Sequence, residues 1–169
     1  MKYAALISFS LFLAACGYSL SSSPYGLKEP LTLSVPVAAN QSPYADLGPN
    51  LTREVISRLD SSSNVTVREE ASATLKMTVA KVQVAGGAWN PYSSEYDLPA
   101  VSASRVVNLT VEAVLEKANA PPRRQVFSSH RNFYINDNEN LTQLLEEEAF
   151  AWVVADLAQK IAQNLFTEF

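Results

Sequence analysis

The stretch VSASRVVNLTVEAVLE, residues 101–116, decides the fold class, because its side chains alternate between apolar and polar. One parity is apolar: Val101, Ala103, Val107, Leu109, Val111, Ala113 and Leu115. The other parity carries the polar residues Ser102, Ser104, Asn108, Thr110, Glu112 and Glu116. Successive side chains of a strand point to opposite faces, so this pattern predicts a long strand with one buried face. Such alternation is typical of an antiparallel sheet that is covered on one side only.

Two alternating segments precede this stretch. Residues 73–79, ATLKMTV, alternate in the same way, but the apolar parity shifts after Val79, which indicates a bulge or a second pairing partner. Residues 31–37 also alternate, and Pro36 predicts that they form an edge strand or an interrupted one. A short extended piece is expected at residues 65–68.

The strand that follows returns over residues 125–135. Phe127, Phe133 and Ile135 share one of its faces. The residues before it, KANAPPRR at 117–124, predict a turn, because both prolines lack the amide hydrogen that a strand ladder requires.

Two amphipathic helices complete the pattern. The first opens at Gly48-Pro49, with proline in the first turn, and its apolar stripe is Leu51, Val55 and Leu59. The second opens at a capping box, Asn140-x-x-Gln143, and runs to about Phe166. Its stripe comprises Phe150, Val154, Leu157, Ile161 and Leu165. We therefore expect an α+β fold of order β-α-β-β-β-α. Its sheet is expected to be mixed, mostly antiparallel and four- to five-stranded. Both helices are expected on one face, because two helices can cover one face of a sheet.

The N-terminal region has the features of an export signal. Residues 1–15 combine Lys2 with a short apolar stretch, which predicts a cleaved signal peptide rather than a membrane span of about 20 residues. The following tetrapeptide, LAAC, resembles the lipobox of bacterial lipoproteins, which implies cleavage before Cys16 and a lipid anchor on its sulfur. Residues 16–30 are rich in Ser, Gly and Pro and are expected to form a lipidated tether. Residues 31–169 are then a single domain.

Composition excludes several classes of function. The net charge of −4, from 13 Lys and Arg against 17 Asp and Glu, disfavours nucleic acid as a partner. One cysteine and one histidine leave no Cys-rich or His-rich metal site, and no cofactor motif is found. His130 is more readily explained as an exposed strand residue than as a catalytic base, and Glu146–Glu148 as a solvated helix face. We therefore expect no catalytic residues, no metal and no cofactor.

The remaining candidates are binding residues. Arg123 and Arg124, expected at a hairpin tip, and Arg131, expected on the face of Phe127 and Phe133, suit phosphate contact; solvated turn charges are the alternative. Three aromatic residues in the loop before residue 101 could anchor a partner protein or could close their own loop: Trp89, Tyr92 and Tyr96.

The order of these segments resembles the LptE family of lipopolysaccharide-assembly lipoproteins. The resemblance rests on Cys16-Gly17-Tyr18, the Leu/Val strand after it, LTRE at 51–54, ATLKMTV at 73–79, ASRVVNLTVEAVLE at 103–116, the strand that ends at Phe133-Tyr134, and the Ala-rich final helix. It implies a sheet backed by two helices that sits as a plug inside the LptD β-barrel of the outer membrane. It also implies a part in barrel assembly and in lipopolysaccharide delivery to the cell surface, with no catalytic residues.

The resemblance gives the arginines a candidate ligand. Lipopolysaccharide phosphates would meet Arg123 and Arg124 first, with Arg105 and Arg131 as the next candidates. Two other functions stay open. One is a different envelope lipoprotein that acts as an accessory or activator of a cell-wall or secretion complex. The other is a hydrolase that uses a serine and His130.

Overall fold

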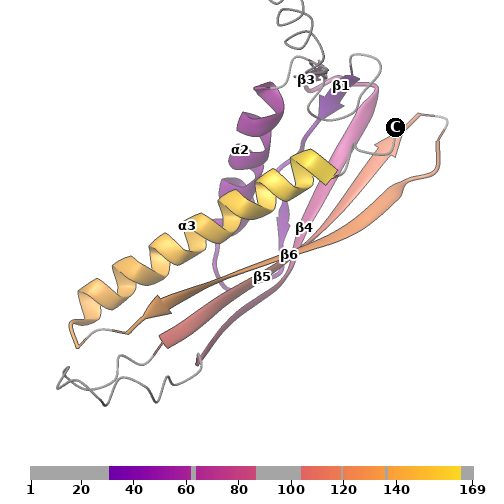
Figure 1. Cartoon of the computed structure of the whole chain (residues 1–169). Helices are drawn as coiled ribbons and strands as arrows, with labels where there is room; N and C mark the ends of the chain where they lie inside the picture. The colour runs from indigo at the N-terminus through magenta and orange to yellow at the C-terminus, as the bar shows by residue number, and fades with distance from the viewer. Residues whose placement is uncertain (1–30, 62–63, 87–103, 119, 136, 165–169) are drawn as a thin grey trace, which may run out of the picture.

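The computed structural model describes residues 31–61, 64–86, 104–118, 120–135 and 137–164, and these form an α+β domain (Figure 1). The sheet has six strands: β1 (Leu31–Ser34), β2 (Ala39–Asn40), β3 (Val65–Val67), β4 (Ala73–Gly86), β5 (Ser104–Lys117) and β6 (Arg123–Tyr134). The helices are α2 (Leu47–Asp60) and α3 (Glu139–Asn164). The expected α+β class is confirmed, β3 corresponds to the extended piece expected at residues 65–68, and the strand count is slightly larger than expected because of the short β2.

The sheet is mixed, with the order β3-β1-β4-β5-β6, and β2 pairs with β4. The three long strands β4, β5 and β6 are antiparallel, whereas β1 pairs in parallel with both β3 and β4. The alternation of β5 is confirmed, because its apolar parity is buried: Val107, Leu109, Val111, Ala113 and Leu115. Val101 and Ala103 lie outside the described residues.

A β-bulge explains the parity shift in β4. Val79 pairs with Val111 and Lys81 with Thr110, so the register shifts by one residue at Ala80. The extra residue returns Val82 to the face of its partner Leu109, because side chains alternate with a period of two. The second pairing partner is present as well, since β2 pairs with β4 at Thr78 and Val79.

Pro36 interrupts the first strand, as expected, but β1 is not at an edge, because it lies between β3 and β4. Thr52 of α2 forms a hydrogen bond with the segment that connects β1 to β2. Its hydroxyl accepts a hydrogen bond from the Ala38 amide at 2.8 Å and donates one to the Gly48 carbonyl at 2.9 Å. Gly48 is needed here, because a Cβ would lie 2.5 Å from the Ala38 oxygen.

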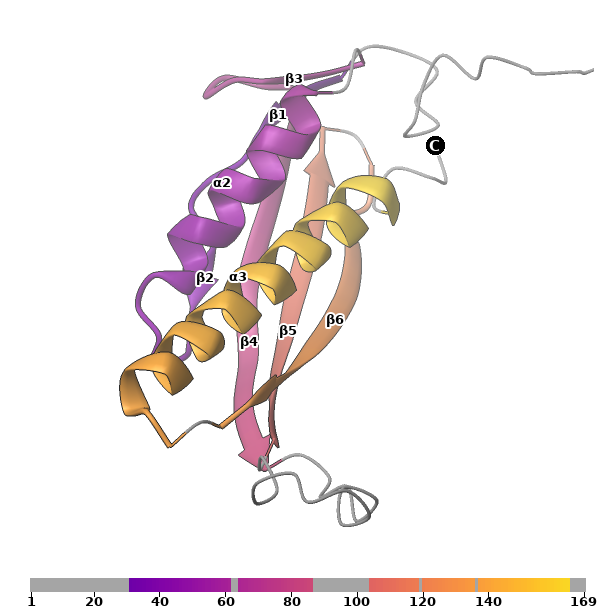
Figure 2. The same ribbon diagram turned by 60° about the vertical axis from the view of Figure 1, so that its left-hand side comes forward.

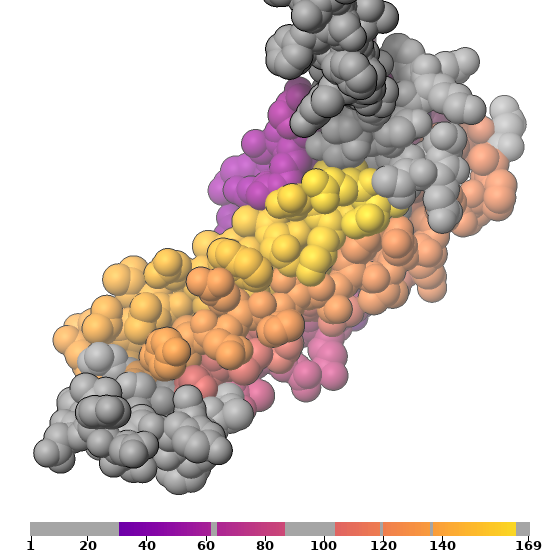
Figure 3. Space-filling view, in the orientation of Figure 1, coloured from indigo at the N-terminus to yellow at the C-terminus, as the bar shows by residue number. Residues whose placement is uncertain are grey.

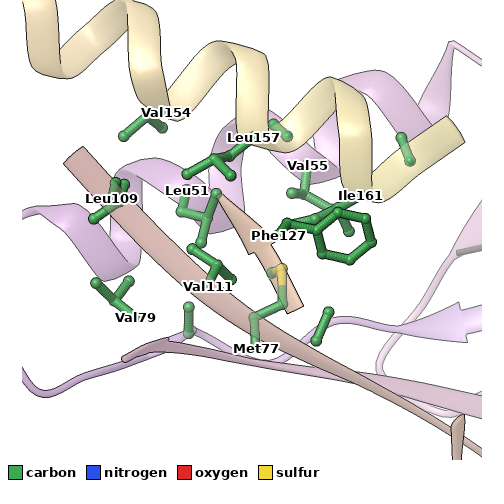
Figure 4. Close-up of a cluster of buried hydrophobic side chains, with 14 of the residues drawn as sticks. Leu51, Val55, Met77, Val79, Leu109, Val111, Phe127, Val154, Leu157 and Ile161 are labelled. Carbon is green, nitrogen blue, oxygen red and sulfur yellow. The ribbon is translucent and has the colours of Figure 1, made fainter. Parts of the chain in front are cut away.

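Both helices cover the same face of the sheet, and α3 crosses it diagonally beside α2 (Figure 2). The core lies between the layers, where Leu51 and Val55 of α2 and Leu157 and Ile161 of α3 face the side chains of β4 to β6 (Figure 4). Phe150, expected on the apolar stripe of α3, is only partly buried, and Leu165 lies outside the described residues. In the described ranges, no helix is both long and apolar enough to span a membrane.

The start of α3 differs from the expected capping box. The Asn138 side-chain oxygen accepts hydrogen bonds from the amides of Asn140 and Leu141, at 3.1 and 3.4 Å, so Asn138 caps the helix. Gln143 instead donates to Glu147 along the helix. Asparagine is favoured at the N-cap, so both Asn138 and Asn140 suit that position.

We expect Leu109→Asp and Ile161→Asp to unfold the domain, because each places an unpaired charge where the native side chain is at most 1% exposed. A domain of this kind has a total stability of only about 5–15 kcal/mol. Thermal melts followed by circular dichroism measure the effect. Gln83→Asp, on the exposed face of the sheet, is the matched control and should melt close to wild type. Similar melts for all three variants would contradict the assignment of the core.

Candidate functional site

Arg123 and Arg124 are the first residues of β6, where they pair with Leu115 and Val114. The expected turn at residues 117–124 is therefore too long, because Lys117 still belongs to β5 and both arginines already belong to β6. The chain leaves the ladder where two consecutive prolines cannot donate hydrogen bonds. Because the two arginines are adjacent in a strand, their side chains point to opposite faces of the sheet.

The two arginines differ in their partners. The Arg124 Nε lies 2.7 Å from the Glu112 Oε1 on the open face of the sheet. Its side chain is 71% exposed, so this ion pair is weak and can exchange for another anion. Arg123 faces the helix side and lies beside Lys117, and both line a small cavity of about 220 Å³ with Leu115, Ala120 and Pro121.

Burial and the charge of Arg123 lower the pKa of Lys117. The cavity therefore has two cationic side chains in its lining, and such groups suit contact with an anionic group. Lys117 was not among the phosphate contacts predicted from the sequence. Its position could have indicated it, because a lysine directly before the turn and two arginines directly after it come together at the end of a hairpin.

The other expected arginines lie at the opposite end of the β5–β6 hairpin. Arg131 is eight residues from Arg123, which corresponds to about 26 Å along a strand. Arg105 pairs with Phe133, two residues beyond Arg131. The four arginines therefore form two separate pairs, and the structure does not bring them into one site.

Arg131 lies on the helix side of β6, the side expected for it. Its guanidinium carbon is 4.8 Å from the centre of the Trp152 ring of α3, which is a cation–π contact. Both residues line a groove of about 440 Å³ between the end of β6 and α3, together with Phe133 and Leu145. Trp152 remains 43% exposed.

Arg105 lines another groove, of about 690 Å³, at the start of α3. The rings of Tyr44 and Phe150 meet there with centroids 4.7 Å apart. The other charged residues that line this groove are all acidic: Asp137, Glu139, Glu146 and Glu147. This acidic surrounding makes Arg105 a poor phosphate contact.

A polar clamp, formed by Ser129, Asp156 and Lys160, joins α3 to β6. The Ser129 hydroxyl donates to Asp156 Oδ2 at 2.6 Å, and Lys160 Nζ lies 2.7 Å from the same oxygen. Lys160 also donates to the Ser128 carbonyl at 3.1 Å. Burial alone would raise the pKa of Asp156, but the hydrogen bonds from Lys160 and Ser129, with the charges of Lys160 and His130, lower it overall.

The other candidates are dispersed or lie outside the described residues. His130 is exposed on strand β6, and Glu146–Glu148 occupy the first half of α3. Across the described ranges, no group of three or more His, Cys, Asp or Glu residues could hold a metal ion. Cys16, Trp89, Tyr92 and Tyr96 lie outside those ranges, so their roles stay predictions.

Comparison with known proteins gives one family match. The family LptE, described as "Lipopolysaccharide-assembly", matches residues 31–168. No curated protein matches the chain. The solved rare lipoprotein B from Shewanella oneidensis is similar, with a TM-score of 0.56 at 17% identity over 79% of this chain and 92% of that chain. A putative lipoprotein from Caulobacter crescentus CB15 has a TM-score of 0.53 at 14% identity, over 80% and 88%. At identities this low, the structural similarity shows a shared fold and nothing about function.

We expect Asp156→Asn to destabilise the protein at pH 7 by about 1–2 kcal/mol, because the clamp loses its charge-assisted hydrogen bonds. Since the folded state lowers the Asp156 pKa from its ordinary value of 3.8, the stabilisation is present above that value and is lost as pH falls further. The difference between wild type and variant should therefore shrink below about pH 4. Thermal melts from pH 7 to pH 2 measure it.

Asp60→Asn, at the exposed end of α2, controls for the loss of one carboxylate. A difference between wild type and Asp156→Asn that stays constant over the whole pH range would contradict the clamp.

Proposed function

Because the chain belongs to the LptE lipopolysaccharide-assembly family, we propose that it is an outer-membrane lipoprotein that plugs the LptD β-barrel, assists barrel assembly and takes part in lipopolysaccharide transport to the cell surface. The observation that carries this proposal is the extent of the family match, which spans the whole described domain. The role is binding and structural, without turnover.

The shape of the domain supports a plug. Two helices and a sheet form two layers, with a hydrophobic core between them, so the domain is stable as a packed unit. The open face of β4 to β6 carries polar and charged side chains, among them Lys76 and Glu116, whose ion pair is 2.7 Å long. A polar face of this kind is compatible with a water-filled barrel interior.

The anchor is proposed at Cys16. Cleavage before it would leave a lipidated residue followed by the tether of residues 17–30. Each buried methylene contributes about 0.8 kcal/mol, so several acyl chains hold a protein on a membrane stably. The residue after Cys16 is Gly17 and not aspartate, which favours localisation to the outer membrane over retention in the inner membrane.

We propose that lipopolysaccharide phosphates contact the cations at the hairpin end: Lys117, Arg123 and Arg124. Lys117 and Arg123 line the same small cavity, which places two cationic side chains where a phosphate group can contact both. The guanidinium groups form forked hydrogen bonds with phosphate oxygens. Arg131 is a weaker candidate because it already stacks on Trp152.

Affinity purification from detergent-extracted outer membranes tests the plug role. We expect a large β-barrel protein to co-purify in equal amounts, and Cys16→Ala to be released from the membrane fraction in folded form, because the anchor is not part of the core. Recovery of a peptidoglycan synthase or a secretion component in place of the barrel would instead support an accessory role. Membrane retention of Cys16→Ala protein that is not bound to the barrel would contradict the anchor.

Replacing the arginines at the hairpin end tests the glycolipid contact. Arg123→Glu combined with Arg124→Glu should weaken capture of purified lipopolysaccharide about tenfold, which corresponds to roughly 1.4 kcal/mol. The loss should be larger at low salt, because screening weakens exposed charges. Stability should change little, since Arg124 is exposed and its ion pair is weak.

The matched control is Arg105→Glu combined with Arg131→Glu, which makes the same charge change at the other end of the hairpin. Barrel co-purification should persist in both variants. Equal capture by wild type and the Arg123/Arg124 variant would exclude the hairpin end as the contact.

A further inference from the structure

The outer edge of β6 is the longest open strand edge of the described sheet. β6 is the last strand in the sheet order and has 12 residues, all paired with β5 on one side. Its other side pairs with no strand in the described part of the chain. An open edge presents unpaired amide and carbonyl groups, which can pair with a further strand.

In one half of this edge, the backbone carbonyl of Ser128 is occupied. Lys160 of α3 donates to the Ser128 carbonyl, and Asp156 holds Lys160 in place. The Ser128 carbonyl therefore points away from β5. In an antiparallel pair, every second residue directs its backbone groups to the same side. The backbone amide and carbonyl groups of His130, Asn132 and Tyr134 therefore also point away from β5.

The other half of the edge lies beside the groove between β6 and α3. Figure 3 shows α3 and β6 next to each other on one face of the molecule. The groove of about 440 Å³ is lined by Phe133 and Arg131 of β6 and by Leu145 and Trp152 of α3. An open edge beside a groove under a helix is the arrangement by which some domains bind an extended peptide as an additional strand.

Charge indicates what kind of strand fits. Within the open stretch of residues 130–134, His130 and Arg131 are basic and no residue is acidic. Arg131 and Glu148 are the charged residues that line the groove, and Arg131 lies on the β6 side of it. A second copy of β6 would bring two basic strands together, whereas an acidic strand complements this edge.

We propose that residues 130–134 of β6 bind an extended acidic segment of a partner protein by strand addition. The backbone groups of His130, Asn132 and Tyr134 pair with the segment. One apolar side chain of the segment enters the groove at Trp152, and a neighbouring carboxylate meets Arg131. The clamp at Ser128 ends the added strand. This inference is independent of the barrel role.

Amide exchange measured by NMR on the full chain in detergent micelles tests the proposal. The probe is the capped peptide Thr-Glu-Thr-Leu-Thr-Glu-Thr, which places leucine and glutamates on one face. At a concentration about ten times its Kd, exchange of the His130, Asn132 and Tyr134 amides should slow roughly tenfold. The amides of Arg131 and Phe133 should not change, because they already face β5. The same peptide with lysine in place of glutamate should give no protection.

Two proline variants separate edge pairing from simple charge attraction. Asn132→Pro removes an outward amide and should abolish protection, while its thermal melt stays near wild type because proline is tolerated on an open edge. Ser128→Pro, at the occupied part of the edge, is the matched control and should keep binding. The proposal is overturned by equal binding of the acidic and lysine peptides, by unchanged binding to Asn132→Pro, or by protection of the same amides in a dimer formed without peptide.

Discussion

The single extra residue at Ala80 is the constraint on which the rest of the sheet depends. Side chains of a strand alternate with a period of two, so one inserted residue exchanges the faces of everything after it. Without the bulge, Val82 and Val84 would point to the open side and polar Gln83 to the core. With it, Val82 and Val84 lie opposite Leu109 and Val107 on the helix side. The bulge therefore keeps Val82 and Val84 on the helix side of the sheet, where they pack against the core.

The attachment of α3 follows from that apolar face and from one polar contact. Leu157 and Ile161 are fully buried against the sheet, and Asp156 joins Ser129 and Lys160 beside them. The apolar contact stabilises the layer, while the hydrogen-bonded carboxylate defines where the helix lies along β6. Near the start of α3 a groove lies between the helix and β6, and Trp152 contacts the strand there through Arg131.

The charged groups that we propose for binding lie at the ends of the β5–β6 hairpin, away from the core. At the turn, Lys117 and Arg123 lie close enough for one to lower the pKa of the other. At the far end, Arg131 stacks on Trp152, and Arg105 lies among carboxylates. A lipopolysaccharide contact at the turn and a protein contact at the far end are compatible on one domain, since about 26 Å of strand separates them.

The sequence by itself determined the features that repeat over short distances. The alternation of residues 101–116, the stripe of Leu51, Val55 and Leu59, and the parity shift after Val79 identified strands, helix and bulge, because periods of 2 and 3.6 are local properties. The basic pair Arg123-Arg124 could also be identified from the sequence, because the two residues are adjacent in the chain.

Only the tertiary structure decided which segments became neighbours. Sequence periodicity does not state that β1 lies between β3 and β4, that Asn138 caps α3, or that Lys117 joins the arginines across the turn. It also predicted four to five strands, because the two-residue β2 carries no periodic signal. The separation of the four arginines and the open edge of β6 follow from strand order and register, which result from packing many distant segments at once.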